Sequence, residues 1–568
     1  MFYKKLPSLN ILVISVSFAF MHNSALANNV IVDVAKSENT TVNKNKDGSE
    51  IIYIDNANDI RLSVNYFEQF NVGKEGVNID NSEAKAKVIL NEVTSKKTSL
   101  LEGKISILGQ DAELIIANPN GIDCYGCQFS GSDKVMLIAG SLDSTNMDNF
   151  KLSGGSVNLK NVINLNEKQM INVFSNSINI LGKNKIPLFN VVNGYERVSF
   201  VDYVWKGEQE KVLSKNNKKE GMSILENSSL KTDFFSLQGG ALNLDGKLVT
   251  KKINIIQNKE INGSEKAVLK IANEINSFRE YNKAETVSIL ALMKLELLKE
   301  DANKLDKIAL ELQDLKHHAI KLDPHGIHKN TKEIIKTADK SRRVADQALE
   351  KIRDAENMLL SIDQVRQEEK THLESNKKII GSEKQYIESD NFNFKGKLAI
   401  INSEVDFNVR NINIDSDQTK VTSYFKNSDV LFNAHKDNHY SGKFGLINSD
   451  IKFLGNRNIQ IGNNSKINEL DKNKLNDINL NKLSMFGSGH VVVFGENVNL
   501  TDTKFKFRQQ LSDPKLSENY IDLIASNEIT IKGQFKPSLI NKNNLFKYAN
   551  KITENDKVIF NISTDKIQ

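Results

Sequence analysis

Short stretches of alternating apolar and polar residues, each followed by Asn, Gly, Asp or Ser, recur along most of this chain of 568 residues. Residues 156–159 (SVNL), 177–182 (SINILG) and 241–246 (ALNLDG) carry apolar side chains at every second position. A period of two predicts short β-strands that end in turns. Between residues 30 and 251 no helical spacing is sustained, so strands alternating with crossover helices are not expected. The pattern is compatible with a sandwich, a barrel or a parallel β-helix.

The pattern changes near residue 264, where a charged stretch without proline begins. Apolar side chains there follow a 4-3 spacing, and a similar spacing returns after the helix-breaking residues 323–326 (DPHG). This spacing predicts two helices that fold back as an antiparallel coiled-coil hairpin, either packed on the strands or projecting as an arm. The seam positions are Ala291, Leu295, Leu298, Ala302, Leu305, Ala309 and Leu312, then Ala338, Ser341, Ala345, Ala348, Ile352, Ala355, Leu359 and Ile362.

Short strands resume beyond residue 391. Segments 398–403, 444–449 and 521–526 all end in Asn-Ser or Ala-Ser, which suggests successive coils of one solenoid. The sequence therefore predicts a mainly β fold that is interrupted by a helical hairpin.

The first residues have the features of a secretory signal peptide. Lys4 and Lys5 precede an apolar run at residues 11–21, and Ala25-Leu26-Ala27 provides a small-residue cleavage site. The apolar run is shorter than the ~20 residues that a membrane-spanning helix needs. We therefore predict a signal peptide at residues 1–27 that directs the chain to the Sec translocon.

Composition narrows the classes of function. Hydrophobic residues make up 39% of the chain and charged residues 26%, which are ordinary values for a folded protein. A net charge of +5 over 568 residues gives no reason to expect nucleic acid as a partner. With two cysteines, the chain has neither a disulfide scaffold nor an all-cysteine zinc site.

Four segments resemble a known protein family. They are residues 65–76 (NYFEQFNVGKEG), 89–95 (ILNEVTS), 115–127 (IIANPNGIDCYGC) and 191–198 (VVNGYERV). Together they resemble the secretion domain of two-partner secretion exoproteins, the filamentous-haemagglutinin and haemolysin family. The Cys-x-x-Cys pair is similar to that of the haemolysin-like branch.

The resemblance implies a right-handed parallel β-helix, and the 4-3 spacing adds the antiparallel α-helical hairpin as an insertion. We accordingly expect a signal peptide at 1–27, a two-partner secretion domain at 28–255, a coiled-coil hairpin at 264–385 and a C-terminal β-helix extension at 391–568. The resemblance also implies a secretion motif made of Asn65, Phe70, Asn71, Asn91, Glu92, Asn118, Pro119, Asn120 and Gly121.

Residues 118–121 also have a direct physical interpretation. Pro119 fixes its own φ, while Asn120 and Gly121 tolerate the conformations that follow in a tight turn. The turn is either a structural reversal after an apolar strand or part of the surface that an outer-membrane transporter recognises. Both roles are compatible.

Cys124 and Cys127 lie three positions apart and would pass through an oxidising periplasm, which predicts a disulfide between them. So short a loop contributes at most about 2 kcal/mol in the chain-entropy model. A redox enzyme would need a thioredoxin-like βαβ setting, and a metal pair would need two further ligands.

No catalytic residue, cofactor or metal site is assigned. Histidines 317, 318, 325 and 328 cluster near the predicted hairpin tip, where an exposed polar loop is favoured over a metal site. Asp406, Asp415 and Asp450 recur near strands, as scattered turn residues do. A phosphate loop, a Gly-x-Ser-x-Gly elbow and a His-Glu-x-x-His helix are all missing from the sequence.

These observations predict a secreted exoprotein without enzymatic activity. Its expected partners are an outer-membrane β-barrel transporter, the Sec translocon and a host or neighbouring cell surface. An adhesin is the favoured function, a pore-forming haemolysin is the alternative, and a β-helix enzyme that degrades polysaccharides ranks third. We expect an extracellular location, and whether the protein stays on the cell surface is left open.

Overall fold

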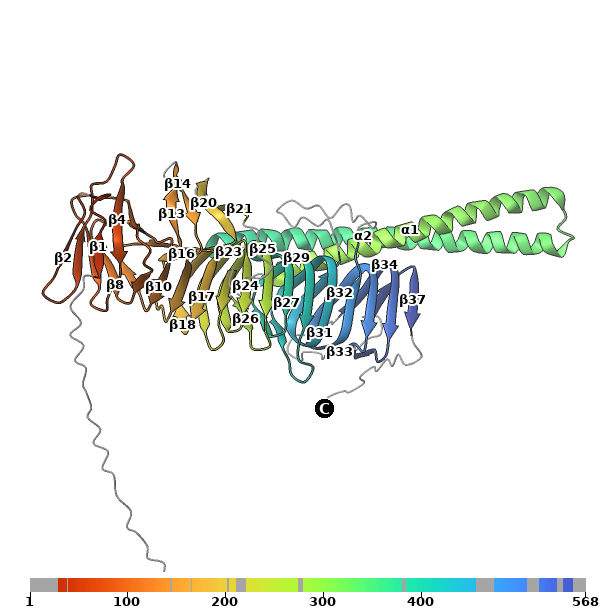
Figure 1. The fold of residues 1–568 in the computed structure, drawn as a ribbon. Helices are drawn as coiled ribbons and strands as arrows, with labels where there is room; N and C mark the ends of the chain where they lie inside the picture. Colours follow the sequence, from red (N-terminus) through yellow and green to blue (C-terminus); the bar gives the residue numbers. More distant parts are fainter. Residues whose placement is uncertain are drawn as a thin grey trace, which may run out of the picture.

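Strands dominate the fold, together with two long helices (Figure 1). The predicted signal peptide at residues 1–27 lies outside the described residues. The computed structural model describes residues 29–37, 39–143, 146–164, 166–201, 204–210, 221–273, 279–380, 385–455, 475–507, 520–538 and 545–554.

One strand, β25 (Lys247–Gly263), shows how the chain winds. Its first residues pair in parallel with β23 (Ser229–Gln238) and β26 (Val268–Ala272), and its middle residues pair with β23 and β27 (Gln385–Phe394). Its last residues pair with β24 (Ala241–Leu244) and again with β27. A single coil therefore takes part in three parallel ladders, and successive coils stack into a helix-like sheet.

The three ladders extend through most of the chain. The first also contains β4 (Leu62–Phe70), β6 (Val88–Val93), β9 (Glu113–Ala117), β12 (Lys134–Ile138), β16 (Met170–Phe174), β19 (Leu188–Val192), β29 (Glu404–Asp415), β31 (Asp429–Leu454), β32 (Ile478–Thr501), β34 (Tyr520–Lys532) and β36 (Leu545–Tyr548). The second begins with β7 (Ser99–Leu101), β10 (Gly121–Tyr125), β15 (Ser156–Lys160), β17 (Ser177–Leu181) and β22 (Gly221–Ile224), and ends with β37 (Lys551–Glu554). The third contains β18 (Lys183–Lys185), β28 (Lys397–Ile401), β30 (Ser423–Lys426), β33 (Lys504–Phe507) and β35 (Lys536–Ser538).

Two smaller sheets flank the N-terminal coils. One contains β2 (Thr41–Lys44), β3 (Glu50–Tyr53), β5 (Val77–Asn81), β8 (Lys104–Gly109) and β11 (Gln128–Ser130). The other contains β13 (Gly140–Asp143), β14 (Asn146–Leu152), β20 (Tyr195–Val201) and β21 (Val204–Glu210). In addition, β1 (Val30–Val32) runs antiparallel to β4, so the first coil is covered by a strand of the opposite direction.

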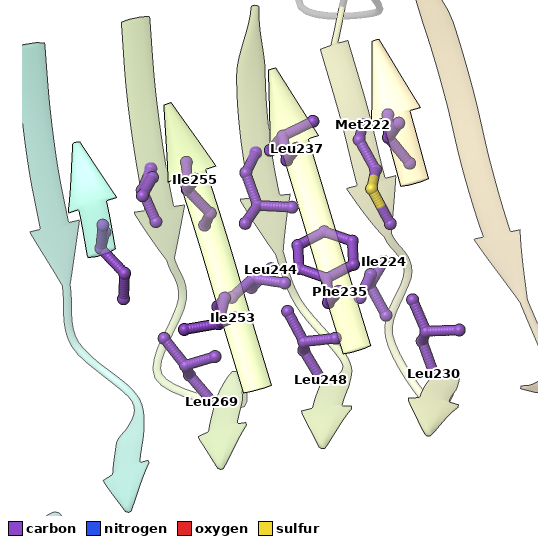
Figure 2. Close-up of a cluster of buried hydrophobic side chains, with 14 of the residues drawn as sticks. Met222, Ile224, Leu230, Phe235, Leu237, Leu244, Leu248, Ile253, Ile255 and Leu269 are labelled. Atoms are coloured by element: carbon purple, nitrogen blue, oxygen red, sulfur yellow. The ribbon is translucent and has the colours of Figure 1, made fainter. Parts of the chain in front are cut away.

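The interior is filled by the apolar side chains that the two-residue period assigns to one side of each strand. Figure 2 shows part of it, where side chains from neighbouring coils lie one above another. Each labelled side chain is at most 1% exposed: Met222, Ile224, Leu230, Phe235, Leu237, Leu244, Leu248, Ile253, Ile255 and Leu269.

Aromatic rings continue this stacking in the C-terminal coils. The ring centroid of Phe407 lies 5.1 Å from that of Phe392 and 4.8 Å from that of Phe432. The ring of Phe432 in turn lies 5.6 Å from that of Phe453. All four side chains are buried, so one column of rings links four successive coils.

The two helices are α1 (Arg279–Leu322) and α2 (Lys329–Ile380). The break between them occurs at the predicted residues 323–326, and the Asp323 carboxylate accepts hydrogen bonds from the backbone N–H groups of Ile327 and His328. These bonds lower the pKa of Asp323. Among the described residues, neither helix is long and apolar enough to cross a membrane. The helices run antiparallel, because three ion pairs join them in opposite chain order: Lys299–Glu356, Asp306–Arg342 and Lys316–Asp339.

Five of the predicted seam positions are buried between the helices, among those whose side chains the structure describes. Leu298 and Leu305, which the spacing places in the same seam, are 47% and 37% exposed. Alanines in the buried row allow the helix backbones to approach closely along that row, and the larger leucines of the other row are turned outward. The buried row consists of Leu295, Ala302, Ala309, Ala338 and Ala345.

The coils before and after the helices are direct neighbours. Ile255 aligns with Ile387, and Leu269 aligns with Leu398, in parallel ladders. The predicted start of the helical segment at residue 264 is too early, because β26 completes a coil before α1 begins. Its alternating residues VLKIA have the period of a strand, which the surrounding charged residues obscured.

Replacing Phe432 by alanine is expected to destabilise the C-terminal coils by about 3–5 kcal/mol, because it removes a ring from the middle of the column and leaves a cavity. Local stability is measured by hydrogen exchange of β29 and β31. The control, Val421→Ala, changes a side chain that is 48% exposed and should shift protection by less than about 0.5 kcal/mol. Equal effects of the two substitutions would contradict the assignment of this core.

Candidate functional site

The predicted secretion-motif residues gather on the first coils of the β-helix. Asn65 in β4 aligns with Asn91 in β6, and Asn91 aligns with Ile116 in β9. The side chains of Asn65 and Asn91 are fully buried. The structure therefore brings residues that are 26 positions apart in the sequence into adjacent positions of one ladder.

Asn65 holds the N-terminal segment against this ladder. Its Oδ1 accepts hydrogen bonds from the Thr40 hydroxyl at 2.8 Å and from the Asp55 N–H at 2.9 Å. Its Nδ2 donates to the Ser63 hydroxyl at 3.2 Å. By contrast, the buried amide of Asn91 has no hydrogen-bond partner among the described residues.

Phe70 and Asn71 lie where β4 ends. The ring of Phe70 is buried and packs edge-on against Phe67, with centroids 5.1 Å apart. The Asn71 Oδ1 accepts a hydrogen bond from the Leu100 N–H at 2.8 Å. These two residues thus fix the end of β4 to the core and to the following coil.

Residues 118–121 form the tight turn that the sequence predicts, with a hydrogen bond from the Gly121 N–H to the Asn118 carbonyl at 3.0 Å. The Asn118 Nδ2 donates to the Lys97 carbonyl and to the Ser99 hydroxyl, both at 2.9 Å. Its Oδ1 accepts a hydrogen bond from the Asn120 N–H at 2.9 Å. The turn is therefore bonded to the segment that joins β6 to β7.

Asn120 and Gly121 complete this arrangement. The Asn120 Nδ2 donates to the Ser95 carbonyl at 2.7 Å. Gly121 has φ of 109°, and a Cβ at this position would lie 2.5 Å from the Ser156 carbonyl oxygen. The Pro119 carbonyl accepts a hydrogen bond from the Ser153 hydroxyl. A side chain at position 121 would therefore force neighbouring coils apart.

Glu92 connects the β-helix to the four-stranded sheet. Its carboxylate accepts a hydrogen bond from the Leu142 N–H at 3.2 Å. Burial raises the pKa of Glu92, and this effect outweighs the opposing influence of the Leu142 N–H and of Lys36. Among the described residues, the Leu142 N–H rather than a close cationic side chain holds the Glu92 carboxylate in place.

Cys124 and Cys127 are joined by a disulfide with their Cα atoms 5.3 Å apart. Both are buried at the end of β10, and the chain turns between them at Gly126, which has φ of 80°. The Gly126 N–H donates to the Lys160 carbonyl at 2.8 Å. The bridged turn is therefore also hydrogen-bonded to the next coil.

The histidines near the hairpin tip are exposed. The Nδ1 atoms of His317 and His318 lie 2.7 and 2.9 Å from the carbonyl oxygens of Gln313 and Asp314. The part of the chain that the structure describes contains no group of three or more His, Cys, Asp or Glu side chains suited to hold a metal ion.

Sequence reasoning missed Asn176, whose side chain holds a later part of the same domain together. Its Oδ1 accepts hydrogen bonds from the N–H groups of Gly194 and Tyr195, at 2.9 and 3.1 Å. The Tyr195 hydroxyl lies 3.1 Å from the Gln257 Oε1. Asn176 follows an apolar strand, as Asn118 does, and this shared position was the signal that would have identified it.

Comparison with known proteins shows what this arrangement resembles. A family model described as "TPS secretion domain" matches residues 29–289. The chain is 28% identical over 195 residues to "16S rRNA endonuclease CdiA" of Enterobacter cloacae, which covers 30% of this chain and 6% of that protein. It is 30% identical over 190 residues to "Hemolysin" of Proteus mirabilis, which covers 30% of this chain and 11% of that protein.

Residues 29–289 therefore match the sequence of a two-partner secretion domain. The family resemblance of the motif segments is thereby confirmed. The match extends past the predicted boundary at residue 255 and includes β26 and the start of α1. The chain spans only a small part of the curated relatives named above. A crystal structure of the filamentous hemagglutinin secretion domain aligns with 18% identity and a TM-score of 0.34, covering 43% of this chain and 96% of that one.

Mass spectrometry of the non-reduced, secreted protein should find the peptide that contains Cys124 and Cys127 lighter by two hydrogens, with neither thiol alkylated. Because the closed loop is so short, replacing both cysteines by serine should cost about 2 kcal/mol or less. Two alkylated thiols in freshly secreted protein would contradict the bridged turn.

Proposed function

We propose that this chain is exported by a two-partner system and acts outside the cell as an adhesin-like protein. In this proposal a signal peptide at residues 1–27 directs it to the Sec translocon. A dedicated outer-membrane β-barrel transporter then recognises the two-partner secretion domain. The remaining coils and the hairpin inserted between them follow it to the cell exterior.

The observation that carries the export proposal is the network around residues 118–121. The amides of Asn118 and Asn120 bond Ser95 and Lys97, which lie between β6 and β7, and Ser99, the first residue of β7. This network lies inside the segment that matches the family model. These hydrogen bonds close the first coils. The domain can therefore begin to fold at its N-terminal end as it leaves a transporter.

Burial also indicates when recognition takes place. Asn65, Asn91 and Asn118 are each 0% exposed in the folded chain. A transporter cannot contact these side chains once the coils have closed. If it binds them directly, it does so while the segment is still unfolded, and folding then removes them from the transporter and favours release.

Replacing Asn118 and Asn120 together by alanine is expected to lower the amount of secreted protein and leave precursor in the periplasm. The substitutions remove several buried or partly buried hydrogen bonds at about 1 kcal/mol each and leave backbone carbonyls without these donors. Immunoblots of culture supernatant and periplasm measure the distribution.

The control variant replaces Asn43 and Asn78, two outward positions of the five-stranded sheet in the same domain, and should be secreted normally. Supernatant levels of the Asn118/Asn120 variant equal to those of the control would count against the role of this turn in export.

The adhesin proposal is supported by the shape of the molecule. The hairpin extends beyond the last described coil and gives the protein an arm that other molecules can reach (Figure 1). No catalytic residue is assigned, and the endonuclease activity in the name of the Enterobacter cloacae relative belongs to that protein. Binding to a host or neighbouring cell surface is the function that this arrangement supports best.

A pore-forming haemolysin is the second candidate. The similarity to "Hemolysin" of Proteus mirabilis is the observation that favours it. A variant without the hairpin distinguishes lysis from binding.

Removing the hairpin is expected to preserve the β-helix and its export. Gln385 aligns with Val405 and Ala272 with Ile401, so two residues between Asn273 and Gln385 reproduce the connection from Asn402 to Val405 in the next coil. A variant with residues 274–384 replaced by Gly-Ser should therefore keep its β circular-dichroism spectrum and be secreted, while binding to target cells falls.

Three outcomes of the hairpin deletion would change the proposal. Undiminished cell binding would move the adhesive surface to the β-helix. Loss of secretion would mean that the hairpin is required for folding. Lysis by the full chain that disappears with the deletion would favour the pore-forming candidate.

A further inference from the structure

The projecting part of the hairpin exposes a row of large apolar side chains. At the base of this part, the Tyr548 hydroxyl in β36 lies 3.1 Å from the Asp301 carboxylate in α1. The hairpin continues past β37, the last described strand (Figure 1). One side of α1 is thus in contact with the β-helix at Asp301 and continues beyond its end.

Ile308, Leu315 and Leu322 follow Asp301 at intervals of seven residues, so all four lie on the same side of α1. The three apolar residues are 50%, 57% and 87% exposed. We call the apolar surface to which they belong the open face. It consists of Leu298, Leu305, Ile308, Leu315 and Leu322 of α1 with Ile334 and Val344 of α2.

The open face lies opposite the ion-paired side of the hairpin. Lys299–Glu356 and Asp306–Arg342 are at 3.0 and 2.8 Å and occupy equivalent heptad positions on the two helices. In an antiparallel pair these positions flank one side of the seam, and the positions of Ile308, Leu315 and Val344 flank the other. The two helices of the hairpin therefore bury one row of seam residues and leave the adjacent row exposed.

We propose that the open face is covered by the open face of a second copy of this chain, so that two hairpins form an antiparallel four-helix bundle. The exposed residues continue the heptad spacing of the buried row, and a surface with this spacing is complementary to another pair of helices. The hairpin of a second copy carries such a surface.

The size of the open face fits a stable dimer. The open face contains seven large apolar side chains, each between 37% and 87% exposed. From Leu298 to Leu322 it extends about 36 Å along two helices that are each about 10 Å wide, so each copy offers roughly 700 Å². A specific interface buries about 800 Å² on each partner. The charged residues that border the face alternate in sign, with Lys304 and Glu311 on α1 and Glu333 and Lys340 on α2, so they do not repel a second copy as a block.

The position of the β-helix determines the antiparallel direction. Asp301 contacts the β-helix through the side of α1 that carries the open face. The β-helix of each copy therefore lies on the side where the second hairpin must approach. Two parallel hairpins would force the β-helices into the same space, whereas antiparallel hairpins place each tip beside the end of the other β-helix.

Sedimentation velocity of the purified full chain tests this proposal. The chain should be a dimer at micromolar concentration, and the double variant Ile308→Lys/Leu315→Lys should be a monomer, because its charges would be buried in the bundle. We expect the dissociation constant to rise at least ~100-fold. The control Leu310→Lys changes a residue that is 54% exposed at a heptad position outside the open face, and it should remain dimeric.

Crosslinking through engineered cysteines tests the direction. Leu315 lies near the middle of the projecting open face, so Leu315→Cys should crosslink with itself between two copies, while Leu322→Cys near the tip should not. Circular dichroism confirms that each variant retains its helices. A full chain that is monomeric at ~100 µM, a Leu310→Lys variant that dissociates equally, or self-crosslinking at Leu322→Cys would each overturn the antiparallel dimer.

Discussion

Each coil of this protein depends on the backbone hydrogen bonds that it forms with the coil before it. A parallel ladder fixes register residue by residue, and a shift of one residue would turn every inward side chain outward. Ile253 illustrates the consequence. Its N–H donates a hydrogen bond to the Gln385 Oε1 at 3.0 Å, and the 131 residues between the two include both helices. The register is thus kept even where the chain leaves the β-helix and returns.

Asparagine reinforces this register on the outside of the coils. The Asn427 Nδ2 donates to the Asn402 Oδ1 at 3.1 Å, and the Asn402 Nδ2 donates to the Asn273 carbonyl at 3.0 Å. Asn402 and Asn427 have φ near 50°, a conformation that asparagine tolerates better than most residues. The motif residue Asn118 serves the same purpose in the secretion domain, where its side chain closes a turn and bonds the preceding segment. The proposed role of Asn118 in export therefore rests on the same type of interaction that stabilises the coils.

The sequence predicted the parts of the fold that follow from local patterns. The period of two located strands such as β15, β17 and β24, and residues 323–326 located the break between the helices. The sequence analysis missed β26, because its five residues among charged neighbours are too few to show a clear period of two. It placed both Leu298 and Ala302 in a buried seam, although only the alanine row is buried, because spacing does not reveal how a pair of helices is rotated. The motif residues were found by resemblance, whereas Asn176 required the folded chain to bring residues 176 and 194 together.

The central claim is that the coils on either side of the helices are direct neighbours. A double variant with cysteines at Asn254 and Tyr386, which are aligned in the first ladder, tests it most directly. Neighbouring strands lie about 4.8 Å apart, within the range that a disulfide spans, so the two cysteines should form a bridge under mild oxidation. Cysteines at Asn254 and Asp406 are separated by two ladder steps and should not form one. A bridge in the second variant, or none in the first, would contradict the continuous β-helix.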